Sequence, residues 1–144
     1  MRNEIGRPEQ QPAIDSAHQP KLVLIVEDEP PIAEALALII EDSGYTTISA
    51  THGREALVLA RTWHPALVFT DLMMPQLNGA ELIAALRADA EAAGETPPPI
   101  VLMTAAGAAY TREARADAVL RKPFDITEIE ALLRRFLDPP HPGG

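Results

Sequence analysis

Five residues that could do chemistry stand where short apolar runs of this chain end. They carry carboxylate, hydroxyl or amine side chains and are Glu27, Asp28, Asp71, Thr104 and Lys122. Each apolar run has the length and composition of a buried β-strand. In an open parallel sheet, ligands bind beyond the carboxyl ends of the strands, at the point where the strand order reverses. We therefore expect these five side chains to converge on one site.

The three carboxylates of this set point to a divalent cation. Carboxylates that share a site repel one another, and the pKa of at least one rises unless a cation joins them. Oxygen ligands with retained waters suit Mg²⁺, whose remaining coordination positions can accept a phosphoryl group. The chain has no cysteine, and no histidine lies in these loops, so zinc is a poor fit. Because Glu27 and Asp28 leave their strand end in different directions, we expect only one to bind the metal directly and the other to act through water.

A carboxylate beside Mg²⁺ can attack phosphorus and hold the phosphoryl group as an acyl phosphate. We assign the nucleophile to Asp71, which ends the predicted central strand between the acid pair and the other two groups. Thr104 would hydrogen-bond one phosphoryl oxygen, and Lys122 would pair with another. Each residue alone would more often be a helix cap, a turn residue or a surface charge. Their joint placement at four strand ends favours a common site.

The elements that must position these residues alternate between strands and helices, as in βαβ units. The predicted strands occupy residues 22–26, 45–49, 66–70, 100–103 and 118–121. The predicted helices begin at 30, with a C-terminal cap at 44, and occupy 54–63, 80–92 and 126–137. A short, weak helix is expected over 108–116. Right-handed crossovers then predict an α/β fold with a doubly wound, five-stranded parallel sheet of order 2-1-3-4-5. We also expect Trp63 to pack the end of the second helix against the core.

Length and composition indicate one domain with two tails. We expect a disordered tail over 1–20, a domain over 21–137 and a flexible tail over 138–144. No apolar run approaches the roughly 20 residues that span a bilayer, and the start lacks a signal peptide, which predicts a cytoplasmic protein without membrane contact. Residues 21–104 carry four basic and twelve acidic side chains, and this local charge of −8 argues against direct binding of nucleic acid.

These residues closely resemble the receiver domain of two-component response regulators, a CheY-like, flavodoxin-like fold, over about residues 21–137. The matching motifs are Glu27-Asp28-Glu29 after the first strand, Asp71-Leu72-Met73-Met74-Pro75 with Asn78-Gly79, Met103-Thr104-Ala105 and Lys122-Pro123-Phe124. The resemblance implies that Asp71 takes a phosphoryl group from a phosphohistidine on a sensor histidine kinase or a histidine phosphotransfer protein. It also implies slow self-hydrolysis of the phosphorylated state.

The resemblance further implies how the metal is held. It assigns Glu27 and Asp28 to Mg²⁺ binding, with the main-chain carbonyl of Met73 as a further ligand. In such domains the bond between Lys122 and the following proline is typically cis, which aims the amine into the site. The side chains of Met73 and Met74 are expected to pack beneath the site rather than to form a sulfur ligand set.

Two departures from the family pattern concern output. The family usually has an aromatic residue three positions before the lysine, where this chain has Val119, and only seventeen residues separate Thr104 from Lys122. We therefore expect helix four to be shortened or irregular. Charge neutralisation at Asp71 would act through Thr104 and Val119 on the helix 4–strand 5–helix 5 face, where an unnamed target protein binds. Phosphorylation is expected to be retained, with an unusual readout.

The preferred interpretation is a stand-alone receiver, and three alternatives remain open. An aspartyl phosphatase of the haloacid dehalogenase type uses the same residue types but needs a second acid two positions after its nucleophile, where this chain has Met73. A flavodoxin-like flavin binder needs a hydroxyl-rich loop after the first strand, where Glu27 and Asp28 would repel the flavin phosphate. A phosphorylation-independent adaptor with the same fold is kept open by Val119 and the short helix four.

Overall fold

Strands and helices alternate along the chain in the computed structural model, which describes residues 20–74, 76–105 and 114–138. The strands are β1 (Leu22–Val26), β2 (Thr46–Ala50), β3 (Leu67–Asp71), β4 (Ile100–Thr104) and β5 (Ala118–Arg121), and the helices are α1 (Pro30–Asp42), α2 (Gly53–Trp63), α3 (Gly79–Ala93) and α5 (Ile126–Leu137). All strand pairs are parallel and the order is β2-β1-β3-β4-β5. The predicted fold class and strand order are therefore confirmed.

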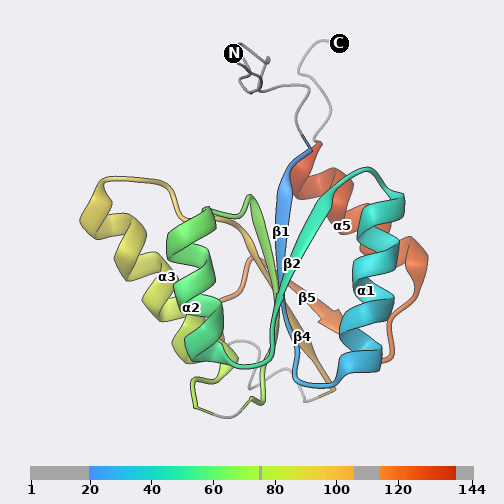
Figure 1. The fold of residues 1–144 in the computed structure, drawn as a ribbon, viewed down its shortest axis with the longest axis horizontal. Helices are drawn as coiled ribbons and strands as arrows, with labels where there is room; N and C mark the ends of the chain where they lie inside the picture. Colours follow the sequence, from blue (N-terminus) through green and yellow to red (C-terminus); the bar gives the residue numbers. More distant parts are fainter. Residues whose placement is uncertain (1–19, 75, 106–113, 139–144) are drawn as a thin grey trace, which may run out of the picture.

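The sheet is covered on both faces, with α1 and α5 on one side and α2 and α3 on the other (Figure 1). Alternate residues of β1 feed the two cores: Leu24 and Val26 pack on the α2 and α3 side, and Val23 and Ile25 on the α1 and α5 side. Because both faces of a central strand are buried, its sequence is apolar at every position. In the described ranges, no helix is long and apolar enough to cross a membrane.

Several observed element bounds differ from the predicted ones by a single residue. β2 and β3 each lie one residue later than predicted, β4 ends one residue later, α2 begins one residue earlier, and α3 is one residue longer at both ends. Such one-residue shifts at ends are common because terminal residues make only part of the hydrogen-bond pattern. Most of the weak helix expected over 108–116 lies outside the described residues.

The expectation that Trp63 packs against the core is wrong, because 59% of this side chain is exposed. Small residues form the inner side of α2, where Ala56 and Ala60 are buried against the sheet. They bring the helix axis close to the strands. Trp63 is the last residue of the helix and is followed by His64 in the left-handed conformation.

The start of α3 packs tightly against the end of β3. Asn78 and Glu81 form a reciprocal capping box that begins the helix, and the Gly79 amide donates a hydrogen bond of 2.9 Å to the carbonyl of Leu72. A Cβ atom added at Gly79 would lie 2.6 Å from the main-chain oxygen of Asp71. Glycine at this position therefore lets the helix approach the strand end that carries Asp71.

We predict that Gly79→Ala lowers the free energy of unfolding by roughly 1–3 kcal/mol, the usual cost of overpacking. Helix propensity alone would favour alanine over glycine, so a loss identifies the steric contact. Chemical denaturation measures it, with Ala84→Gly as an exposed control on the same helix. A Gly79→Ala variant as stable as the wild type would show that this approach is not tight.

Candidate functional site

The strand register brings the chemically active residues to one edge of the sheet. Val26 pairs with Thr70, and Asp71 with Met103, so the residues that end β1, β3 and β4 are neighbours. Thr104 pairs with Arg121, the last residue of β5. Because parallel strands end at the same edge, the five candidate residues lie at adjacent strand ends rather than scattered over the surface.

Three carboxylates meet at this edge. Ligand oxygens of Glu27, Asp28 and Asp71 all lie within 4.8 Å of one another. Glu27 and Asp71 are buried, with 1% and 9% of their surface exposed, whereas Asp28 is exposed. Two buried acids and one exposed acid leave an opening toward solvent through which a cation or a phosphoryl group can enter.

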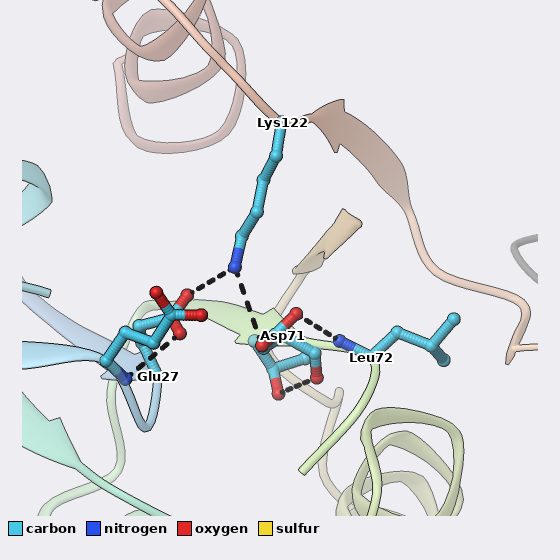
Figure 2. A network of polar contacts seen from close by, with 6 residues as sticks. Glu27, Asp71, Leu72 and Lys122 are labelled. Carbon is cyan, nitrogen blue, oxygen red and sulfur yellow. Dashed lines mark hydrogen bonds and ion pairs between the residues drawn. The ribbon is translucent and has the colours of Figure 1, made fainter. Parts of the chain in front are cut away.

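Lys122 bridges two of these carboxylates (Figure 2). Its Nζ atom lies 2.8 Å from Oε1 of Glu27 and 3.5 Å from Oδ2 of Asp71. The bond between Lys122 and Pro123 is cis, as the resemblance implied. Sequence reasoning assigned this amine to a phosphoryl oxygen; in the structure its nearest partner is Glu27, which the sequence did not reveal.

Burial sets the electrostatics of the cluster. It raises the pKa of Glu27 above its ordinary value, and the hydrogen bond from Lys122 opposes that rise only in part. Burial likewise raises the pKa of Asp71, against the attraction of the Lys122 ammonium. For Lys122, burial disfavours the charged form, but the hydrogen bond to Glu27 and the attraction of Asp71 outweigh it and raise its pKa. The two buried acids are therefore incompletely neutralised.

A main-chain amide and a side-chain hydroxyl hold Asp71 in place. The Leu72 amide donates to Oδ1 of Asp71 at 3.0 Å, and the Thr70 hydroxyl donates to the Asp71 carbonyl at 3.0 Å. With Oδ1 held by the backbone, Oδ2 is the oxygen that faces Lys122 (Figure 2). Sequence reasoning did not identify the Leu72 amide, since a main-chain donor leaves no trace in residue type.

Glu27 and Asp28 differ in how many of their oxygens are already engaged. Oε1 of Glu27 accepts from Lys122 at 2.8 Å, and Oε2 accepts from the Glu29 amide at 3.2 Å. Asp28 is exposed, and no hydrogen bond or ion pair holds its carboxylate among the described residues. Asp28 is therefore the acid of the pair that is better placed to bind a metal directly.

The remaining candidates surround this cluster. Thr104 is buried at the end of β4, and its carbonyl accepts from the Lys122 amide at 3.0 Å. The expectation that Met73 packs beneath the site is wrong, because its side chain is 71% exposed; Met74 does pack against the core. Val119 pairs with Leu102 and is 43% exposed on the sheet face that carries α2 and α3.

An apolar hollow of about 530 Å³ adjoins Lys122, which sequence reasoning missed. Its lining residues come from α1 and from the segments after β4 and β5: Pro31, Ile32, Ala35, Ala105, Lys122, Pro123 and Phe124. In the sequence, Pro31 and Ile32 indicated only the start of a helix and its apolar side. The hollow offers an apolar surface beside the carboxylate cluster.

Comparison with known proteins agrees with this geometry. The family model of the response regulator receiver domain matches residues 23–134. The chain is 37% identical over 124 residues to response regulator Rre1 of Synechocystis sp., an alignment that covers 83% of this chain and 52% of that protein. The chain thus spans about half the length of the curated relatives it matches.

Solved structures show the same fold. A response regulator from Chloroflexus aurantiacus J-10-fl superposes with a TM-score of 0.75 at 27% identity and covers 84% of this chain and 100% of its own. The chemotaxis protein CheY4 of Vibrio cholerae superposes with a TM-score of 0.74 at 28% identity and covers 83% of this chain and 100% of its own.

We predict that Asp71→Asn stabilises the metal-free protein at neutral pH, on the order of 1 kcal/mol. The folded pKa of Asp71 lies above its ordinary 3.8, so the stability linked to its proton is complete at acidic pH and is lost as the pH rises through the folded pKa. Asparagine keeps the oxygen that accepts from Leu72 and removes the charge. Urea unfolding in EDTA at a series of pH values measures the difference.

The matched control is Glu34→Gln, which removes an exposed carboxylate on α1 and should change stability by only a few tenths of a kcal/mol. If Asp71→Asn were less stable than the wild type at neutral pH, burial would not be disfavouring the charged form of Asp71.

Proposed function

The chain belongs to the response regulator receiver domain family of two-component signalling, and we propose that it accepts a phosphoryl group on Asp71 from a phosphohistidine in a Mg²⁺-dependent reaction. The single observation that carries this is the cluster of Glu27, Asp28 and Asp71, whose oxygens lie within 4.8 Å of one another. The ammonium of Lys122 stands beside it.

The donor set fits Mg²⁺, because it consists of oxygens alone and two of its carboxylates are buried and incompletely neutralised. Asp28 and Asp71 would bind the ion directly, and Glu27 would bind it through water. The main-chain carbonyl of Met73 would be a further ligand. When bound, the ion neutralises the charge between the carboxylates and the oxygens of an incoming phosphoryl group.

The transfer step uses Oδ2 of Asp71. This oxygen forms a bond to phosphorus as the bond between phosphorus and the histidine nitrogen breaks, and the released imidazole takes a proton from solvent. Leu72 holds Oδ1 and so orients the nucleophile. Lys122 would then exchange Glu27 for a phosphoryl oxygen, and the Thr104 hydroxyl would bind another. Slow attack of water on phosphorus would then break the bond between phosphorus and Oδ2, which returns the free carboxylate and releases inorganic phosphate.

The input partner would be a histidine kinase or a histidine phosphotransfer protein. On the output side, the change at Asp71 would act through Thr104 and Val119 on the face formed by the segment after β4, by β5 and by α5, and so alter binding of a target protein. The receiver domain would extend over 21–137. That the receiver stands alone and makes no direct contact with DNA stays a prediction, because the chain spans half of its relatives' length.

Of the earlier alternatives, family membership removes the aspartyl phosphatase and the flavin binder. The phosphorylation-independent adaptor is the second candidate. The observation that favours it is Val119, whose small and partly exposed side chain stands where the family usually has an aromatic residue.

We predict that acetyl phosphate with Mg²⁺ raises the intact mass of the chain by one phosphoryl unit, and that EDTA prevents the rise. Asp71→Asn should abolish it, since the nucleophile is gone, while Glu34→Gln should leave it unchanged. Intact-mass spectrometry at several incubation times measures the gain. A wild-type chain that takes up no phosphoryl group from acetyl phosphate with Mg²⁺ would favour the adaptor.

We also predict that Lys122→Met binds Mg²⁺ several-fold more tightly than the wild type. The ammonium competes with the metal for Glu27 and Asp71, and one unit charge at this distance is worth roughly 1 kcal/mol even in water. Isothermal titration measures the affinity. The chain has only two lysines, so Lys21→Met, at the opposite end of β1, is the matched control and should leave the affinity unchanged; weaker binding by Lys122→Met would contradict the competition.

A further inference from the structure

The apolar hollow of about 530 Å³ beside Lys122 is a space that a small molecule can enter. Its walls are formed by the first turns of α1, by the residue that follows β4 and by the residues that follow β5. Ile32 and Phe124 are half-buried on these walls, whereas Ala35 is exposed. The hollow therefore has an apolar wall and reaches solvent.

Lys122 connects this hollow to the carboxylate cluster. Its side chain lines the hollow, and its Nζ atom lies 3.5 Å from Oδ2 of Asp71 (Figure 2). The hollow thus begins within the length of one side chain of the oxygen that would attack phosphorus. Although three carboxylates stand at the adjoining edge, none of the described residues that line the hollow is acidic. An anion with a hydrocarbon tail therefore meets an ammonium and an apolar wall side by side.

The geometry of phosphoryl transfer determines which part of a donor lies near the hollow. The attacking and leaving oxygens stand roughly in line, with phosphorus between them. The leaving group therefore lies beyond the phosphoryl group as seen from Asp71. Because Lys122 would bind a phosphoryl oxygen and also lines the hollow, a leaving group with a hydrocarbon part can place that part against the apolar wall.

We propose that the hollow binds the hydrocarbon chain of a small acyl phosphate, so that this protein reacts faster with acyl phosphates longer than acetyl phosphate. The inference rests on the proposed phosphorylation of Asp71 and names a class of small-molecule donor for the same site. Oδ2 of Asp71 forms the bond to phosphorus. The bond between phosphorus and the acyl oxygen breaks, its electron pair stays on that oxygen, and a free carboxylate leaves without any proton transfer.

Burial of the additional carbon atoms gives the selectivity its size. Each methylene moved from water into apolar surroundings favours binding roughly fourfold. Butyryl phosphate has two methylenes more than acetyl phosphate, and the hollow reaches solvent, so burial is incomplete and we expect about a fivefold gain in the second-order rate constant. Acetate and butyrate are leaving groups of nearly equal basicity, so the two donors have matched intrinsic reactivity.

Rates of phosphoryl uptake by the full chain from equal concentrations of acetyl phosphate and butyryl phosphate, both with Mg²⁺, test the proposal. Intact-mass spectrometry at early times gives the two rates, and butyryl phosphate should react about fivefold faster. Phosphoramidate, which has no hydrocarbon part, serves as a reference donor. Equal rates from the two acyl phosphates would overturn this proposal and leave phosphorylation of Asp71 standing. Uptake from none of the three donors would overturn both.

Ala35→Gln places the selectivity in the hollow. Ala35 is exposed on α1 and lines the hollow, so a longer polar side chain there occupies the space and makes its wall polar, while glutamine remains a good helix former. The ratio of the butyryl to the acetyl rate should fall to about one. Ala131→Gln makes the same change at an exposed position of α5 outside the hollow and should keep the wild-type ratio. Circular dichroism checks that both variants fold. A wild-type ratio in Ala35→Gln, or a ratio lost in Ala131→Gln, would overturn the proposal.

Discussion

Burial of two carboxylates beside a third at one edge of a parallel sheet is the constraint on which the site depends. Glu27 and Asp71 are buried, which raises the pKa of both, and the ammonium of Lys122 neutralises them only in part. Such a cluster lowers the stability of the folded protein unless a further cation joins it. The same incomplete neutralisation that disfavours the metal-free state supports our proposal that this edge binds a divalent ion and, beside it, a phosphoryl group.

The rest of the fold holds this cluster in place. Continuous apolar strands buried between two helical layers bring the strand ends into register, and the close approach of Gly79 fixes the turn that follows Asp71. The Leu72 amide engages one oxygen of Asp71, which leaves the other toward Lys122. The orientation of the Asp71 carboxylate thus comes from the backbone, while its pKa is raised by burial and lowered by Lys122. Asp71 therefore combines a carboxylate held in place by the backbone with a raised pKa.

The sequence was sufficient to predict that Glu27, Asp28 and Asp71 meet at one edge of the sheet, because strand periodicity and the parallel topology together determine which strand ends are neighbours. It was not sufficient to predict which charge Lys122 contacts, since that depends on side-chain conformation and on the burial of Glu27. It also failed for Trp63, where residue type suggested core packing but small alanines on the inner side of α2 leave the ring exposed. The prediction that Met73 packs beneath the site was also wrong, because the position of this residue in its loop, and not its type, determines how exposed it is.

The dependence of folding stability on Mg²⁺ concentration tests the central claim most directly. A cation that binds only the folded cluster raises the free energy of unfolding with the logarithm of its concentration once it exceeds the dissociation constant. Wild-type protein should show this rise in urea unfolding at neutral pH, and Asp28→Asn, which removes the exposed acid, should show little of it. Equal stability with and without millimolar Mg²⁺ would contradict the view that the three carboxylates form a cation site.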